Sequence, residues 1–234
     1  MVAPHLGTLV RVSDICKHYG ATVALDGVSF TIRSAEVLGV IGPNGSGKTT
    51  LFECLGGVLP FDAGAIQPVE AERRDIFYLP DGIAPWPSES IDWAQRFVVG
   101  LFGGRGEGRD LMNHRLGLDA ILHRPLGTLS KGQRKRAVLA IGLLTPHRIL
   151  LVDEPFDGLD LRQTREAAAL LREEVCPERT LVLSIHQIAE AELVCDRFLL
   201  LSGGQVRGEG TLAELSASAS RVGSKLEEVF LALT

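Results

Sequence analysis

The chain has 234 residues, which suits one large domain or a core with a small inserted lobe. Its formal net charge of −5 provides no overall positive field for nucleic acid, and the basic run at 134–136 is typical of a solvated helix face. The four cysteines have neither zinc-site spacing nor the pattern of a compact disulfide framework, so we expect a reducing compartment. Residues 1–7 lack a secretory signal pattern, and no apolar stretch approaches the roughly 20 residues of a membrane span. The sequence therefore predicts a soluble chain that does not bind nucleic acid.

Strand patterns dominate the first 80 residues. Apolar and alternating runs predict strands at 8–12, 28–33, 37–41 and 76–79. A helix is expected from Lys48 to the glycine pair at 56–57. This order favours a small antiparallel sheet near the N-terminus, laid against a larger α/β core.

The loop after the strand at 37–41 carries the strongest chemical signal. Residues 42–50 read GPNGSGKTT between a predicted strand and a predicted helix, a pattern typical of triphosphate binding. The backbone N–H groups can cradle phosphate oxygens, Lys48 can reach the β- and γ-phosphates, and the Thr49 hydroxyl can bind Mg²⁺. The alternative, a glycine turn without a ligand, is disfavoured by the strand before the loop and the helix after it. The residues expected to bind nucleotide here are Gly42, Pro43, Asn44, Gly45, Ser46, Gly47, Lys48, Thr49 and Thr50.

The character of the sequence changes at Pro80. Three prolines within 80–90 predict a loop of restricted geometry, and a glycine-rich stretch at 100–108 predicts a turn or surface loop. Helical spacing predicts helices at 91–101, 109–118 and 120–124. The segment from about 80 to 135 therefore reads as a helical insertion between two halves of a parallel α/β core.

Alternation of strands and helices returns in the second half. The continuous apolar runs at 149–152 and 180–185 predict strands that are buried on both faces, with a helix at 161–175 between them. A hairpin is expected at 198–207, and an amphipathic helix at 225–233.

Two carboxylates at the end of a buried strand form the second chemical signal. Asp153 and Glu154 directly follow the run at 149–152, which places them at the carboxyl edge of the sheet, where open α/β folds bind ligands. Asp153 can hold the water shell of Mg²⁺, and Glu154 can polarise the water that attacks the γ-phosphorus. The alternative is that these acids only cap the next helix.

A third motif, LSKGQ at 129–133, opens the helix before that strand. Ser130 alone could be an ordinary N-cap, but this leaves Gln133 and the basic run unexplained. Together with the two sites above, the motif resembles the signature sequence LSGGQ of the ATP-binding subunits of ABC transporters at four of five positions, with Lys131 as the departure. The resemblance covers essentially the whole chain.

This resemblance implies a fold and a division of the chain. The fold is α/β: a P-loop NTPase core, with a mainly parallel sheet flanked by helices, an N-terminal antiparallel β subdomain and an inserted helical subdomain. Residues 1–79 and 136–234 would form the nucleotide-binding core with the β subdomain, and residues 80–135 the helical signature subdomain. The implied activity is hydrolysis of ATP with Mg²⁺.

The resemblance also implies roles for single residues. Tyr19 would stack on adenine, and His186 would hydrogen-bond the γ-phosphate and hold Glu154 and water in line. Ser130, Gly132 and Gln133 of one copy would contact the nucleotide that is bound by a second copy. Asp160, in the sequence GLD at 158–160, would cross the interface between the two copies.

One position departs from the family pattern. The family has a glutamine after the run that here reads IFYLP at 76–80, but residue 81 is aspartate. Asp81 can still bind Mg²⁺ directly or through water, although it adds negative charge beside the triphosphate. A simple Asp-Gly turn is the alternative.

The family further implies partners. We expect a second nucleotide-binding subunit, identical or a paralogue, and a separate transmembrane permease that docks near 81–88, with the chain peripheral at the cytoplasmic face of the plasma membrane. The C-terminal segment at 226–234 resembles that of bacterial ABC-2 type exporters. A non-transport ABC ATPase, such as an iron–sulfur assembly ATPase, is the alternative.

Overall fold

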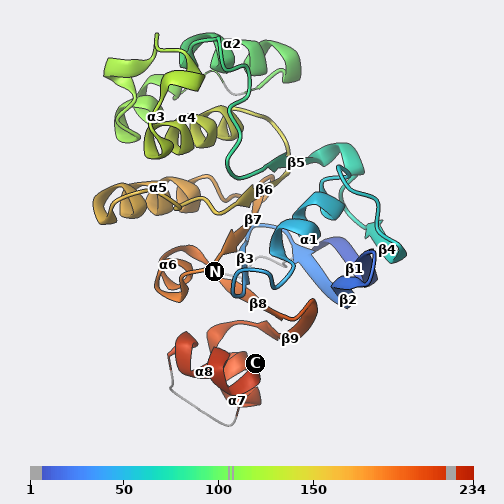
Figure 1. The fold of residues 1–234 in the computed structure, drawn as a ribbon. Helices are drawn as coiled ribbons and strands as arrows, with labels where there is room; N and C mark the ends of the chain where they lie inside the picture. Colours follow the sequence, from blue (N-terminus) through green and yellow to red (C-terminus); the bar gives the residue numbers. More distant parts are fainter. Residues whose placement is uncertain (1–6, 105, 107, 220–224) are drawn as a thin grey trace.

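The structure, a computed structural model, describes residues 7–219 apart from 105 and 107, and residues 225–234. Its centre is a sheet of six strands in the order β5-β6-β7-β3-β8-β9 (Figure 1). The strands are β3 (Val37–Ile41), β5 (Ile76–Leu79), β6 (Ile149–Asp153), β7 (Thr180–Ile185), β8 (Arg197–Ser202) and β9 (Gln205–Gly210). All neighbouring pairs are parallel except the β8–β9 hairpin. The predicted α/β class with a mainly parallel sheet is confirmed.

A second, antiparallel sheet has the order β2-β1-β4. Its strands are β1 (Thr8–Tyr19), β2 (Thr22–Arg33) and β4 (Ala63–Pro68). The first two are longer than predicted because register shifts interrupt their alternation of apolar and polar residues. The sequence gives no sign of β4, since Ile66 is its one buried side chain.

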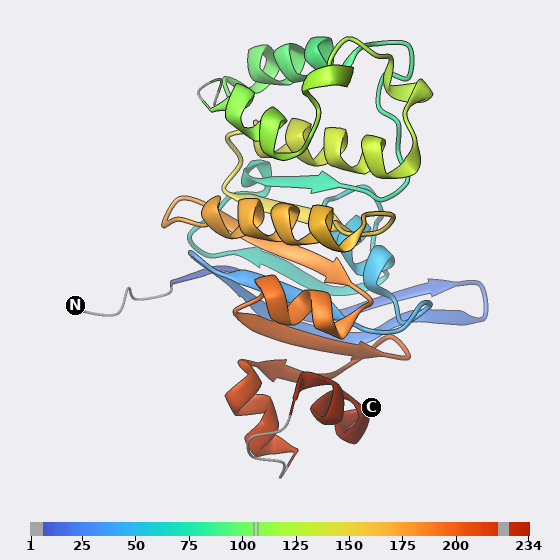
Figure 2. The same cartoon turned by 90° about the vertical axis from the view of Figure 1, so that its left-hand side faces the viewer.

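Alternate side chains of the central strands enter two separate cores. Val37 and Ile41 of β3 pack in one core, and Leu38 and Val40 pack in the other. The first core includes residues of helices, and the second includes residues of the antiparallel sheet, as expected for strands that are covered on both faces. Figure 1 shows the sheet nearly edge-on between these layers, and Figure 2 shows it through the helices that cover one face.

Eight α-helices complete the described part of the chain. They are α1 (Lys48–Leu55), α2 (Ile91–Phe102), α3 (Arg109–Arg115), α4 (Lys131–Leu143), α5 (Leu161–Glu173), α6 (Ile188–Val194), α7 (Leu212–Ser218) and α8 (Leu226–Leu233). The segment predicted as a helix at 120–124 is instead a 3₁₀ turn at Asp119–Ile121. Within the described ranges, no helix is both long and apolar enough to cross a membrane.

Helices α2, α3 and α4 gather beyond the β5 edge of the central sheet (Figure 1). The expected boundary between 135 and 136 falls inside α4, whose residues 137–143 are all buried. These residues belong to the same core as Leu150 of β6 and Leu183 of β7. The division at 80–135 stays a prediction, and residues 105 and 107 of its glycine-rich loop lie outside the described residues.

Candidate functional site

The glycine-rich loop joins β3 to α1, as predicted, and its conformation requires glycine. Gly47 has φ +105°, and a Cβ atom there would lie 2.5 Å from the Ala24 carbonyl oxygen. Lys48, the first residue of α1, is buried and donates to the carbonyl oxygens of Gly42 and Pro43 at 2.8 and 3.3 Å. Its ammonium group therefore lies over the loop and faces the space that the loop encloses.

This loop forms part of a cavity of about 350 Å³. The cavity is lined by Thr22, Val23, Ala24, Asn44, Gly45, Gly47, Lys48, Thr49, Thr50, Asp81 and Glu154. Tyr19 is not among these lining residues, but it pairs with one of them, Thr22, across the β1–β2 turn and is 48 % exposed. Lys17 Nζ is 5.8 Å from the centre of the Tyr19 ring. An exposed aromatic ring at this place can stack on a planar ligand.

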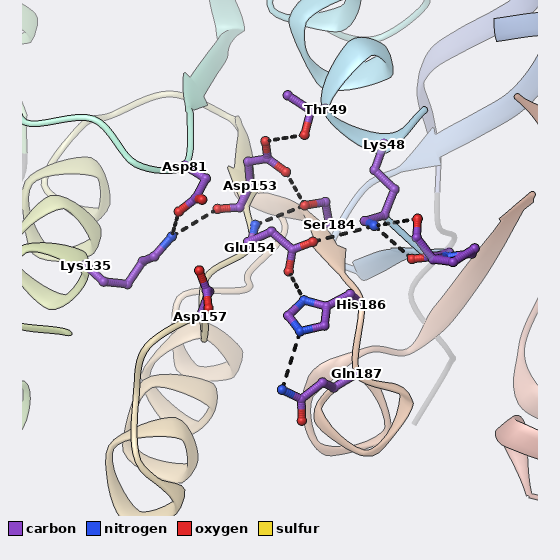
Figure 3. Close-up of polar contacts among 12 residues, drawn as sticks. Lys48, Thr49, Asp81, Lys135, Asp153, Glu154, Asp157, Ser184, His186 and Gln187 are labelled. Atoms are coloured by element: carbon purple, nitrogen blue, oxygen red, sulfur yellow. Dashed lines mark hydrogen bonds and ion pairs between the residues drawn. The ribbon is translucent and has the colours of Figure 1, made fainter. Parts of the chain in front are cut away.

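Asp153 ends β6 and is held by hydroxyl groups on both of its oxygens (Figure 3). Thr49 donates to Oδ2 at 3.0 Å, Tyr78 reaches the same oxygen at 3.5 Å, and Ser184 donates to Oδ1 in a short contact. Burial raises the pKa of Tyr78, and the charge of Asp153 raises it further. The tyrosine therefore stays protonated and can donate to the carboxylate.

Glu154 contacts both Lys48 of the glycine-rich loop and His186. Its carboxylate accepts from His186 Nδ1 at 2.5 Å through one oxygen and lies 3.6 Å from Lys48 Nζ through the other. Its backbone is in the left-handed region, with φ +48°. Figure 3 shows Lys48, Glu154 and His186 converging from α1, β6 and the end of β7.

The residues present fit a magnesium–triphosphate. Thr49 and Asp153 offer two hard oxygen ligands 3.0 Å apart, and Mg²⁺ usually takes few protein ligands beside phosphate and water. The buried Ser46 hydroxyl, inside the loop, has no hydrogen-bond partner among the described residues. Over the same ranges, no group of three His, Cys, Asp or Glu side chains could hold a metal ion.

The signature residues lie at the start of α4, away from this cavity. Ser130 is the N-cap of α4 and forms a capping box with Gln133. Lys131 pairs with Asp157 at 2.5 Å, which raises the lysine pKa and lowers the aspartate pKa. A Cβ on Gly132 would lie 2.7 Å from the Gly158 carbonyl oxygen, so the signature closely contacts the loop after β6.

Two further predicted residues are placed as follows. Asp160 is the N-cap of α5 and forms a capping box with Gln163. Asp81 lies beside the loop cavity, but its carboxylate pairs with Lys135 of α4 in a short contact. Lys135 Nζ also lies 3.5 Å from the Asp153 carbonyl oxygen.

Sequence reasoning missed several side chains of the site, among them Ser184, Lys135 and Asp157. Ser184 gave one signal, a hydroxyl inside the otherwise apolar end of a buried strand. Lys135 and Asp157 gave none, because a basic helix face and an acidic turn are usually solvated. Their partners become visible only when α4 is placed against the ends of β5 and β6.

The fold and the site define a P-loop nucleoside triphosphatase. The sequence profile of the "ABC transporter" family matches residues 25–157, more than half of the chain. The chain is 32% identical over 211 residues to the "Taurine import ATP-binding protein TauB" of Escherichia coli (strain K12), covering 85% of this chain and 82% of TauB. The chain therefore belongs to the ABC transporter family, as an ATP-binding subunit that hydrolyses ATP.

Two other comparisons agree with this assignment. The "Probable multidrug ABC transporter ATP-binding protein YbhF" of Escherichia coli (strain K12) is 27% identical over 241 residues, covering 97% of this chain but only 42% of YbhF. A solved structure, titled "Structure of ATP binding subunit of ABC transporter", has a TM-score of 0.86 at 25% identity and covers 97% of this chain and 99% of its own.

Proposed function

We propose that two copies of this subunit, or one copy and a paralogue, close around two ATP molecules and drive export through a separate membrane permease of the ABC-2 type. The observation that carries the catalytic part is the contact of Glu154 with both His186 and Lys48. An acid at the end of a parallel strand, beside a phosphate-binding loop, is placed to act on a bound triphosphate.

Each residue then has a defined task. Lys48 and the loop amides bind the β- and γ-phosphates, and Tyr19 supports the adenine ring. Thr49 and Asp153, joined by Asp81 through water, hold Mg²⁺, which supplies charge neutralisation at the phosphates. Glu154 accepts a proton from the attacking water, while His186 fixes the direction of the Glu154 carboxylate and contacts the γ-phosphate.

Closure by a second copy is supported by the position of the signature. Ser130, Gly132 and Gln133 are absent from the residues that line the loop cavity. Their side of α4 leaves Ser130 exposed. In the proposed pair, these residues of one copy complete the ATP site of the other, in an isologous arrangement in which Asp160 lies at the seam.

The surface beside Asp81 supports a membrane partner. Trp86, five residues after Asp81, packs edge-on against Trp93 and Phe97, whose rings stack on each other, and each of the three is more than one-third exposed. Exposed aromatic clusters of this kind are typical of protein interfaces. This surface would receive the permease, which would hold the chain at the cytoplasmic face of the membrane. Export is proposed because the C-terminal segment at 226–234 resembles that of ABC-2 type exporters. The similarity to TauB, an import protein by its name, is the reason to test the direction.

The substitution Glu154→Gln tests the catalytic assignment. Removing the general base should lower kcat for ATP by about 10²- to 10⁴-fold and leave ATP binding intact. The ATP-bound variant should then accumulate as a closed pair, which sedimentation or light scattering would detect. Glu190→Gln is the matched control, because it removes a half-buried carboxylate that acts on His186 and Glu154 through its charge.

Several outcomes would contradict the proposal. Normal turnover by Glu154→Gln would remove Glu154 as the base, and a monomeric ATP-bound variant would remove the closed pair. Isolation of the chain from native membranes without a polytopic partner would favour a non-transport ATPase. Uptake of substrate in whole cells, rather than ATP-driven accumulation in inside-out vesicles, would reverse the direction of transport.

A further inference from the structure

Ser184 of β7 and His186, the residue after that strand, both contact Glu154. The Glu154 backbone N–H donates to Ser184 Oγ at 2.9 Å and to the Ser184 carbonyl oxygen at 3.2 Å. The Glu154 carboxylate accepts from His186 at 2.5 Å. Residues two apart in an extended chain point to the same side, so Ser184 and His186 face Glu154 together. Figure 3 shows Ser184 between Asp153 and Glu154.

The Ser184 hydroxyl serves both carboxylate residues at once. It donates its one proton to Asp153 Oδ1 and accepts from the Glu154 N–H. A hydroxyl has one donor and two acceptor positions, so both contacts can be satisfied together. Ser184 is fully buried and lies on the α1 side of the sheet, between the magnesium-binding oxygens and the catalytic base.

The backbone of Glu154 gives this contact its importance. A left-handed conformation is unfavourable for a non-glycine residue, and such conformations persist only where the surroundings enforce them. The two hydrogen bonds to Ser184 fix the Glu154 amide directly after β6. They therefore set the direction in which the Glu154 side chain leaves the strand.

We infer that Ser184 is a positioning residue of the ATPase site, whose hydroxyl aligns the metal-binding carboxylate of Asp153 with the catalytic carboxylate of Glu154. The inference rests on the proposed roles of these two acids. Residues that orient metal ligands typically contribute about 10- to 100-fold to metal affinity or activity. Ser184 should contribute in this range to kcat and to the affinity for the divalent ion, and little to binding of metal-free nucleotide.

The test compares Ser184→Ala with Ser184→Thr in the full chain, assembled with its membrane partner. Ser184→Ala should lower kcat by about 10- to 100-fold and weaken Mn²⁺ binding in the presence of ATP, measured by electron paramagnetic resonance titration. ATP binding in EDTA should change less than about threefold. Ser184→Thr, which keeps the hydroxyl, should restore both kcat and Mn²⁺ affinity to within a few-fold of the wild type.

Thr180→Val provides a matched control. It also deletes a fully buried hydroxyl from β7, but that hydroxyl donates to the Arg33 carbonyl oxygen, far from the acids. This variant should lower the melting temperature without changing Mn²⁺ affinity. Ser184→Cys, nearly equal in size to serine and only a weak donor, replaces the alanine variant if that chain does not fold.

The outcomes separate this inference from the proposed function. Wild-type kcat and Mn²⁺ affinity in a folded Ser184→Ala or Ser184→Cys chain would overturn the positioning role, even if Glu154→Gln is inactive. Equal losses in the alanine and threonine variants would also overturn it, because volume rather than the hydroxyl would then decide. If Glu154→Gln itself turns over normally, the failure lies in the proposed function.

Discussion

Glu154 combines a catalytic position with an unfavourable backbone conformation. Its φ is +48°, and it is one of only four non-glycine residues with positive φ in the described ranges. The corner turns the chain sharply after β6 and directs the carboxylate to His186 and Lys48. The strained backbone therefore lowers the stability of the fold but holds the carboxylate in a functional position, as is common at active sites.

A pair of substitutions measures this cost. Glu154→Gly and Glu154→Ala both remove the carboxylate, but only glycine adopts the left-handed region without strain. We expect the glycine variant to be more stable by about 1 kcal/mol, which corresponds to a melting temperature about 2–4 °C higher for a chain of this size. Thermal unfolding without nucleotide measures the difference. Equal stability, or a less stable glycine variant, would show that the corner is not strained.

At the scale of elements, an ion pair links helix α4 to the nucleotide edge of the sheet. Lys135 of α4 is nearly buried and contacts Asp81 after β5, with the Asp153 carbonyl oxygen close by. The same helix begins with Ser130 and Gln133. A shift of the chain at Asp81 would therefore be transmitted to the start of α4.

A double-mutant cycle between Asp81→Asn and Lys135→Met tests this attachment. Partners in direct contact in a shielded position couple by about 0.5–3 kcal/mol, and loss of one partner leaves an unpaired charge. We expect a coupling in that range from denaturant unfolding. The exposed pair Glu72–Arg74, tested in the same way, should couple by less than about 1 kcal/mol. Additive effects at Asp81 and Lys135 would mean that the contact does not stabilise the fold.

The elements that could be predicted from the sequence share one property: strong burial on a regular pattern. β3, β6 and β7 are buried at every position and read as apolar runs. By contrast, β4 buries one side chain, and the seven-residue helices α6 and α7 bury two each. Their formation depends on neighbours that are distant in sequence, so local patterns cannot identify them.

The same distinction applies to the site. Three buried strands can be recognised in the sequence, and each is followed by part of the site: the glycine loop, the pair Asp153 and Glu154, and His186. Their proximity could be expected because the ends of parallel strands meet at one edge of the sheet. The partner of Asp81 could not, because Lys135 approaches it from a helix that is 54 residues away in the chain. Whether Asp81 binds Mg²⁺, as the sequence suggests, stays a prediction.

On the scale of the whole molecule, His147 joins the helical cluster to the central sheet. Its ring lies between Phe77 of β5 and Phe102 of α2, with centroids 4.8 and 4.9 Å away. Its Nδ1 atom is buried without a hydrogen-bond partner among the described residues. Burial lowers the pKa of His147, Arg179 lowers it further, and Asp75 acts in the opposite direction.

This environment predicts a pH dependence of stability. Between the lowered folded pKa and the ordinary value near 6.5, the unfolded chain binds more protons than the folded chain. The contribution of neutral His147 is therefore complete above about pH 6.5 and is lost as the pH falls below it. His147→Phe keeps an aromatic ring without a titrating group, so its stability should fall less between pH 7.5 and 5.5.

Denaturant unfolding of both chains across that range provides the measurement. Groups that titrate alike in the two proteins cancel in the comparison, including the carboxylates of lowered pKa, which act at lower pH. Parallel pH profiles for the wild type and His147→Phe would contradict the prediction.

The shared core beneath α4 has a practical consequence for anyone who wishes to dissect this ATPase. Ile91 of the helical cluster and Leu150 of the sheet belong to one continuous apolar cluster, and α4 runs through it. Dividing the chain at residues 80 and 135 would cut that helix and expose apolar side chains of the shared core on both fragments. We therefore expect neither fragment to fold when it is transferred to another protein. Chimaeras should express well only if they exchange α4 as an intact helix.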